Sequence, residues 1–254
     1  MTKEVAFFVT CLVDELFPEV GEASVACLER AGCRLDFPRA QTCCGQPAFN
    51  MGYQDEARRL ARRFIEIFEP YDAIVAPSGS CTSMVRVFYP ELFEGEPEWQ
   101  ERARRLASRV YELTEFLSKE GFRSGKGGTA GVSKRVTYHD SCHLLRELGV
   151  CDQPRRLLRE VDGLDLVELP GANVCCGFGG AFSVKMSELS EAMLNDKLDA
   201  LQSTGAEILT ATDCGCLMHL EGALRRRGTG LRAVHVARIL AGDELCSSAP
   251  IASR

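Results

Sequence analysis

The cysteines of this 254-residue chain occur in the same order twice. In each half an isolated cysteine is followed, after 31 or 32 residues, by a Cys-Cys-Gly triplet and later by one further cysteine. Corresponding cysteines lie 131, 132 and 135 residues apart. The first set is Cys11, Cys43, Cys44 and Cys81, and the second set is Cys142, Cys175, Cys176 and Cys216. Such similar offsets indicate an internal duplication, with one repeat in residues 1–124 and the other in residues 125–254.

Strand and helix patterns alternate within each half. Amphipathic runs at residues 53–69, 97–119 and 182–203 predict helices. Short runs rich in β-forming residues predict strands at Val5–Thr10, Arg34–Phe37, Ala73–Ala76, Val136–His139, Leu164–Leu169, Glu207–Thr210 and Leu231–Val236. The alternation favours an α/β fold made of two tandem repeats, each with a mostly parallel sheet flanked by helices. The glycine-rich stretch Gly121–Ser133 is predicted to connect the repeats flexibly.

The position of the cysteines relative to the predicted strands suggests a ligand site. In each repeat one cysteine follows the first predicted strand, and another follows the third. These are Cys11, Cys81, Cys142 and Cys216. In open α/β sheets, ligands bind at the edge where the strands end, so each repeat is expected to gather its cysteines there.

The composition limits the class of protein. The formal net charge is -6, which offers no basic field for nucleic acid. We find no apolar run long enough to span a bilayer and no signal peptide, so the protein is expected in the cytoplasm and not integral to a membrane. Thiols in a reducing cytoplasm are seldom structural disulfides, and 13 cysteines therefore indicate metal binding or redox chemistry.

Four thiolates per repeat are the usual complement of a [4Fe–4S] cluster, so up to two clusters are predicted, one per repeat. Zinc also accepts four thiolates and stays an alternative, although neither set contains a Cys-x₂₋₄-Cys pair of the usual zinc kind. The adjacent cysteines could instead form labile vicinal disulfides. The cysteines outside the repeat pattern are expected to be small hydrophobic residues. They are Cys27, Cys33, Cys151 and Cys246.

Several other residues are candidates for the same sites. Glycines after the cysteine pairs would let the backbone approach a cofactor; they are Gly45, Gly177, Gly179 and Gly180. The last two belong to a Gly-Phe-Gly-Gly segment for which an anion site is the alternative interpretation. His139 and His143 flank Cys142, and either could ligate, donate to a cluster sulfur or carry a proton. Asp140 is predicted to cap a helix. His143 and Lys185 are the candidate catalytic residues.

These motifs resemble the cysteine-rich CCG domain family, which includes the B subunit of heterodisulfide reductase, the glycolate oxidase iron–sulfur subunit and the anaerobic glycerol-3-phosphate dehydrogenase C subunit. The chain is most similar to the short lactate utilization members. Nearly the whole chain takes part in the resemblance. The stretches that carry it are Cys43–Asn50, Pro77–Cys81, His139–Leu144, Cys175–Gly180 and Gly215–Met218.

The resemblance implies a function. It predicts an iron–sulfur electron-transfer subunit of an L-lactate oxidation system that converts lactate to pyruvate. The partners would be a separate ferredoxin-like iron–sulfur subunit and a further small subunit. The alternatives are a catalytic subunit that acts on a disulfide or a hydroxy acid at its own cluster, and a zinc- or thiol-based interaction protein.

Two features of the chain depart from the larger relatives. Each heterodisulfide reductase repeat ends in Cys-x-x-Cys and binds a noncubane cluster through five cysteines. Here Ser78 and Asp213 replace the first cysteine of that pair. Four-cysteine sites are therefore favoured, with Cys214 as a possible extra ligand in the second repeat. The chain also has no ferredoxin-like cysteine module and no flavin or nicotinamide motif, so electrons would have to come from a partner.

Overall fold

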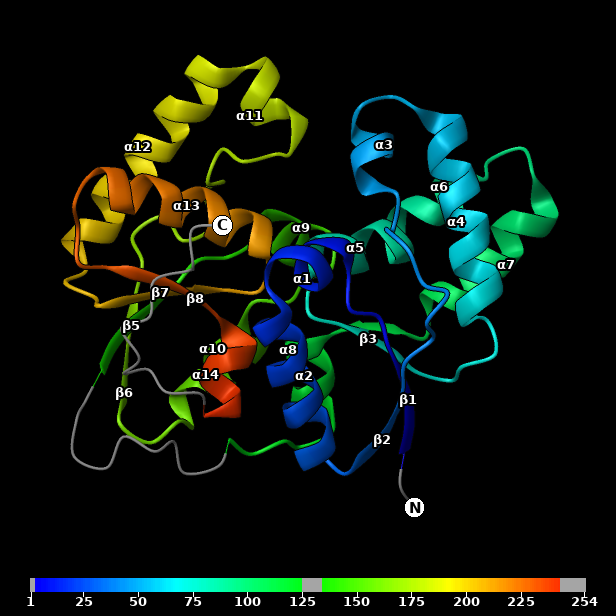
Figure 1. Ribbon diagram of the computed structural model, residues 1–254, viewed down its shortest axis with the longest axis horizontal. Helices are drawn as coiled ribbons and strands as arrows, with labels where there is room; N and C mark the ends of the chain where they lie inside the picture. The colour runs from blue at the N-terminus through cyan, green and yellow to red at the C-terminus, as the bar shows by residue number, and fades with distance from the viewer. Residues whose placement is uncertain (1–2, 125–133, 243–254) are drawn as a thin grey trace.

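The computed structural model describes residues 3–124 and 134–242 (Figure 1). Each half contains one four-stranded sheet, and all strand pairs in both sheets are parallel. The strand orders are β2-β1-β3-β4 and β6-β5-β7-β8, so the second sheet repeats the order of the first. The predicted α/β fold with two similar repeats is confirmed.

The first repeat begins with a strand and two helices and ends with a strand followed by a helix. Its elements are β1 (Lys3–Phe7), α1 (Cys11–Leu16), α2 (Pro18–Arg30), β2 (Cys33–Asp36), α3 (Gln46–Asn50), α4 (Gln54–Phe68), β3 (Ile74–Ala76), α5 (Gly79–Ser83), the π-helix η1 (Met84–Phe88), α6 (Tyr89–Leu92), α7 (Pro97–Ala107), β4 (Val110–Glu112) and α8 (Leu113–Lys119).

The second repeat follows the same plan with fewer helices between its last two strands. Its elements are β5 (Lys134–Tyr138), α9 (Cys142–Arg146), α10 (Asp152–Arg159), β6 (Leu164–Glu168), α11 (Ala181–Lys185), α12 (Ser187–Ser203), β7 (Ile208–Ala211), α13 (Cys214–Arg226), β8 (Arg232–His235) and α14 (Val236–Ala241).

Single hydrogen bonds show how closely the repeats correspond. The Phe8 amide, just after β1, donates to the Val75 carbonyl at 2.9 Å. The His139 amide, just after β5, donates to the Thr210 carbonyl at the same distance. Phe8 and His139 are 131 residues apart, which is the offset of Cys11 and Cys142. The two residues therefore occupy the same structural position in the two repeats.

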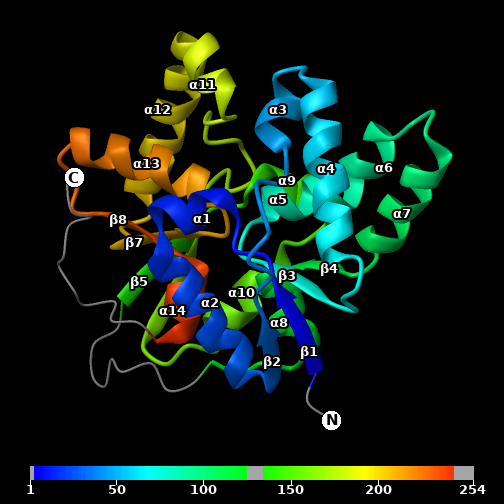
Figure 2. The same ribbon diagram turned by 45° about the vertical axis from the view of Figure 1, so that its right-hand side comes forward.

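One apolar core is shared between the repeats. It contains Val5 and Phe7 of β1, Val136 of β5, and side chains of helices from both halves. Figures 1 and 2 show α2 and α8 lying beside α10 and α14, between the two sheets. The outer face of each sheet has its own core, built on α4 and α7 in the first repeat and on α12 and α13 in the second. The central helices thus join the two sheets into one body.

Three local predictions need correction. Residues 97–119 are not one helix, because Val110–Glu112 forms the edge strand β4, whose apolar residues continue the helical spacing of their neighbours. The predicted helix 182–203 breaks at Met186, where the backbone leaves the helical region. Asp140 caps no helix: Ser141 is the N-cap residue of α9, and Asp140 pairs with Arg155 instead.

Two further sequence predictions concern the segment that connects the repeats and the absence of a membrane-spanning helix. Most of the predicted connection Gly121–Ser133, together with Cys246, lies outside the described residues. In the described ranges, no helix is both long and apolar enough to cross a membrane.

Candidate metal centre

The two cysteine sets meet at one cavity. It has a volume of about 280 Å³ and lies between the repeats, at the carboxyl ends of strands in both sheets. Helix α3 of the first repeat and α11 of the second contribute to its walls and stand on the same side of the molecule (Figures 1 and 2). The cysteines that line it are Cys11, Cys43, Cys44, Cys81, Cys142, Cys175, Cys176, Cys214 and Cys216.

In the first repeat, short contacts join the thiols. Cys11 begins α1, and its sulfur lies 3.7 Å from the sulfur of Cys43. The Gly45 amide donates to the Cys43 sulfur at 3.4 Å, and Tyr89 donates to the Cys44 carbonyl at 2.8 Å. The bond from Cys11 holds the pKa of Cys43 well below its usual range, and it raises the pKa of Cys11. The first set therefore favours one thiolate, at Cys43, with several donors around it.

The residue before Cys11 has an unusual backbone. Thr10 has φ 71° and ψ 148°, and among the described residues it is the one non-glycine residue with positive φ. A β-branched side chain is strained in this conformation, and such strain persists only where the surrounding structure imposes it. Thr10 lines the cavity and is 3% exposed. Its counterpart Ser141 has an ordinary φ of −65°, so the two repeats present their first cysteine differently.

The second set has the same plan. Cys142 begins α9, Cys175 and Cys176 precede α11, and Cys216 lies in the first turn of α13. The Gly177 amide donates to the Cys175 sulfur at 3.4 Å, as Gly45 does in the first repeat. The pKa of Cys175 is held well below its usual range, first by Cys142 and then by Cys176, which donate to its sulfur.

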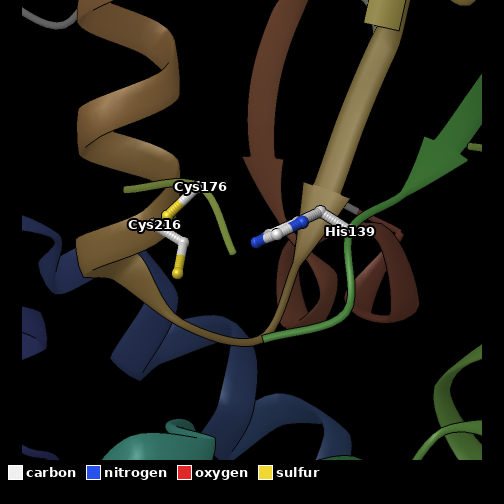
Figure 3. A group of neighbouring side chains, drawn as sticks. All are labelled: His139, Cys176 and Cys216. Atoms are coloured by element: carbon white, nitrogen blue, oxygen red, sulfur yellow. The ribbon is translucent and has the colours of Figure 1, made fainter. Parts of the chain in front are cut away.

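A histidine distinguishes the second set from the first. His139 is 1% exposed, and within the described part of the chain neither ring nitrogen has a hydrogen-bond partner. Figure 3 shows its ring pointing from the end of β5 toward Cys176 and Cys216, and the ligand atoms of these three residues lie within 4.8 Å of one another. The pKa of Cys216 falls to about 6, because Cys176 donates to its sulfur and His139 lies beside it. The counterpart residue in the first repeat is Phe8, a core residue packed edge-on against Phe64.

The donor set fits a thiolate-bound metal group. Each repeat supplies four cysteine sulfurs and one backbone N–H aimed at a sulfur. A side chain at Gly177 would place its Cβ 2.6 Å from the Ser190 carbonyl oxygen, so only glycine allows this close turn. The unpartnered nitrogens of His139 are a further sign, since buried polar groups normally have partners. A metal or cluster would satisfy all of these groups.

The cysteine-rich domain model of the CCG family matches this chain twice, at residues 5–86 and 136–221. The chain belongs to the CCG family. Two relatives extend over nearly the whole chain. It is 48% identical to lactate utilization protein A of Geobacillus kaustophilus, over 93% of this chain and 98% of that protein. It is 47% identical to lactate utilization protein A of Bacillus subtilis, with the same coverage.

A solved structure shows the same fold at low sequence identity. The crystal structure of a hypothetical protein from Helicobacter pylori matches with a TM-score of 0.65, 12% identity and 95% of this chain covered. This chain spans about half of that protein, 49% of its length.

The remaining predicted residues of this CCG protein lie at different distances from the cavity. His143 is half-buried, lines the cavity and has its Nδ1 3.7 Å from the Cys142 sulfur. Lys185 is exposed at the end of α11 and is not among the cavity-lining residues. Cys214, the first residue of α13, is 4% exposed and reaches the cavity wall. Gly179 and Gly180 line the mouth on the exposed side. Their roles stay predictions.

The structure adds one contact and one residue that sequence reasoning missed. Ser78 and Asp213 meet across the repeats: the Ser78 hydroxyl donates to Asp213 Oδ1 at 2.9 Å. Lys197 of α12 is 2% exposed and donates to the Gly171 carbonyl at 2.6 Å. Burial lowers its pKa, while the neighbouring thiols Cys176 and Cys175 act in the opposite direction. Lys197 lies three residues after Leu194 and four before Leu201, so helical spacing places it on the buried face of α12 and could have identified it.

Proposed function

We propose that this protein is an iron–sulfur electron-transfer subunit of a system that oxidises L-lactate to pyruvate, working with separate partner subunits. The observation that carries the proposal is the convergence of two equivalent four-cysteine sets on one cavity between the repeats. Four thiolates per set match the ligand complement of a [4Fe–4S] cluster. The match of both repeats to the cysteine-rich domain family supports the same assignment.

The lactate part of the proposal has separate support. The relatives that are 47–48% identical over 93% of this chain carry the name lactate utilization protein A. Similarity of that extent supports a role in the same kind of lactate utilization system. The proposed substrate, L-lactate, is taken from the names of these relatives. The cavity supplies no substrate assignment of its own.

The residues of the chain would prepare each site for its cluster. When bound, a cluster of this kind takes up and releases single electrons. Cys44 and Cys176 are 2% and 1% exposed, so the protein keeps water from one side of each site. The amides of Gly45 and Gly177 donate to cysteine sulfur and stabilise the thiolate form. Low exposure and fixed donors also influence the reduction potential of a bound cluster.

The first experiment is metal analysis of the full-length protein after anoxic purification. We expect iron and acid-labile sulfide in equal amounts, a brown colour and an EPR signal on reduction. Iron and sulfide near zero after anaerobic reconstitution would refute the cluster assignment. A colourless protein with stoichiometric zinc would refute it in favour of a structural zinc site.

Matched cysteine variants test the ligand sets. Cys43→Ala and Cys175→Ala should each lower the iron content, because each removes a sulfur from a different set. Cys33→Ala is the control: Cys33 is buried in the shared core and does not line the cavity. Equal iron loss in all three variants would indicate general unfolding and contradict the assignment of ligands.

A genetic experiment tests the lactate part. Deletion of the gene should abolish growth of the native organism on L-lactate and leave growth on pyruvate unchanged, because pyruvate enters after the proposed step. Normal growth of the deletion strain on L-lactate would reject the substrate assignment and leave the cluster assignment standing.

A further inference from the structure

The second repeat places a buried imidazole where the first repeat has a phenyl ring. The amides of Phe8 and His139 make the same 2.9 Å bond to the third strand of their sheets, which fixes the two positions as equivalent. Phe8 is fully buried among aromatic rings, with centroids 4.8 Å from Phe64 and 5.6 Å from Phe68. Its ring therefore serves packing in the first repeat.

The loop that carries His139 is held in place by fixed contacts. The Arg155 guanidinium binds both carboxylate oxygens of Asp140, at 2.7 and 2.8 Å, and Arg155 also pairs with Glu168 at 3.0 Å. The Asp140 amide donates to the Ala172 carbonyl at 3.2 Å. Because the residue after His139 is held on both its backbone and side chain, the imidazole is aimed at the sulfurs by a preformed loop.

Both nitrogens of His139 lack a partner in the described ranges, although the ring lies beside two thiols. A buried polar group without a partner destabilises the fold, so its presence beside two thiols indicates a functional role. The four thiols of the second set already provide one sulfur for each iron of a four-iron cluster. A ring N–H next to a thiolate then acts as a hydrogen-bond donor rather than as a fifth ligand.

A second polar group near the second cysteine set would also stabilise negative charge there. Lys197 of α12 carries its ammonium into the interior and holds it against the Gly171 carbonyl at 2.6 Å. The corresponding helix of the first repeat, α4, buries only apolar residues. They are Ala57, Ala61, Phe64, Ile65 and Phe68. The second cysteine set therefore has a hydrogen-bond donor, His139, and a positive charge, Lys197, nearby. The corresponding positions of the first repeat, Phe8 and the buried face of α4, provide neither.

We propose that His139 donates a ring N–H hydrogen bond to the Cys216 thiolate of the loaded second site and makes that site the one with the higher reduction potential. The inference rests on the proposed iron–sulfur function. A donor to a cluster sulfur stabilises the added negative charge of the reduced state, which raises the potential. One electron that leaves the first site can then pass downhill to the second, with no other reagent needed for this internal step.

The test is an EPR-monitored redox titration of the anoxically reconstituted, full-length protein. The wild type should show two midpoint potentials. His139→Phe, which copies the residue of the first repeat, should shift the higher potential downward toward the lower one and leave the lower one unchanged. His139→Gln keeps an N–H donor and should retain part of the difference. It also provides a second variant if the phenyl ring prevents folding.

The control is His235→Gln. His235 is also a buried histidine of the second repeat, but it is bonded to the backbone at Thr212 and Ala237. It does not line the cavity, and its substitution should lower the melting temperature without moving either potential.

Three outcomes would overturn the inference. The first is an unchanged higher potential in His139→Phe with iron and sulfide retained. The second is a strong ¹⁴N coupling in pulsed EPR of the wild type, which would make His139 an iron ligand. The third is loss of iron in both His139 variants. A wild type without iron and sulfide would overturn the proposed function itself, so the two failures are distinguishable.

Discussion

The hydrogen bonds between Ser80 and Asp213 allow a quantitative test of how the repeats are held together. Asp213 Oδ1 accepts three bonds from the other repeat: from the Ser78 hydroxyl at 2.9 Å, the Ser80 amide at 3.0 Å and the Ser80 hydroxyl at 2.7 Å. Asp213 is 4% exposed. Ser80→Ala removes the shortest of the three bonds and leaves the other two in place.

The expected cost follows from the charge and burial of the acceptor. A hydrogen bond to a charged group contributes about 1.5–3 kcal/mol, and the two remaining donors place the loss near the lower end, at about 1.5–2 kcal/mol. For a protein of this size, each kcal/mol lowers the melting temperature by about 2–4 °C. Ser80→Ala should therefore melt about 3–8 °C below the wild type.

The assay is thermal unfolding of the metal-free protein, followed by circular dichroism under reducing, anoxic conditions. A double-mutant cycle with Asp213→Asn should give a coupling energy of about 1–2 kcal/mol, since the two residues contact each other directly. The control is Ser203→Ala, because the exposed Ser203 hydroxyl bonds a carbonyl of its own helix, at 2.7 Å, and its loss should cost less than about 0.5 kcal/mol. Additive effects of Ser80→Ala and Asp213→Asn would refute the inter-repeat bond.

Three further predictions test other features. Burial raises the pKa of Glu112 to about 8, so the folded protein keeps a proton that the unfolded chain loses above its usual pKa of 4.5. The free energy of unfolding should therefore fall as the pH rises from about 4.5 to 8, by about 1.4 kcal/mol per pH unit, and Glu112→Gln should flatten this dependence in urea titrations. Burial lowers the pKa of His235, whose Nδ1 accepts the Ala237 amide, so stability should fall as the pH drops below 6.5, and His235→Asn should lack this loss. Gly177→Ala should lose iron from the second site, whereas Gly52→Ala, with positive φ but open space, should keep its iron and lose about 1–2 kcal/mol of stability.

The sequence was sufficient for the features that repeat. Two Cys-Cys-Gly triplets with matched neighbours predict the duplication and single out the cysteines of the two sets, which line the cavity because they follow strands whose carboxyl ends share one edge of each sheet. Their role as ligands stays a prediction. The strand β4 was not predictable in the same way. A strand of three residues, Val110–Glu112, is shorter than one period of a helical pattern, so its apolar residues fit the neighbouring helices equally well.

The features that differ between the repeats required the structure. The sequence places His139 near Cys142, while its proximity to Cys176 and Cys216 depends on how β5 and α13 pack. The offset of 131 residues aligns His139 with Phe8, so the repeat pattern itself marks a polar residue at a core position. The contact of Ser78 with Asp213 joins different repeats and has no sequence signal of its own.

The cavity depends on both repeats because each one closes the other's site. At Gly79 of the first repeat, a side-chain Cβ would lie only 2.6 Å from the Leu144 Cβ of the second. The close approach of α5 to α9 therefore requires glycine at this position. Leu144 follows the ligand candidate Cys142 by two residues, and Gly79 precedes Cys81 by the same distance. A larger residue at Gly79 must therefore separate the two cysteine sets as well as the two helices. The duplication yields two cysteine sets of one plan that line one cavity, and under the proposed function the difference between Phe8 and His139 would set the direction of electron transfer between them.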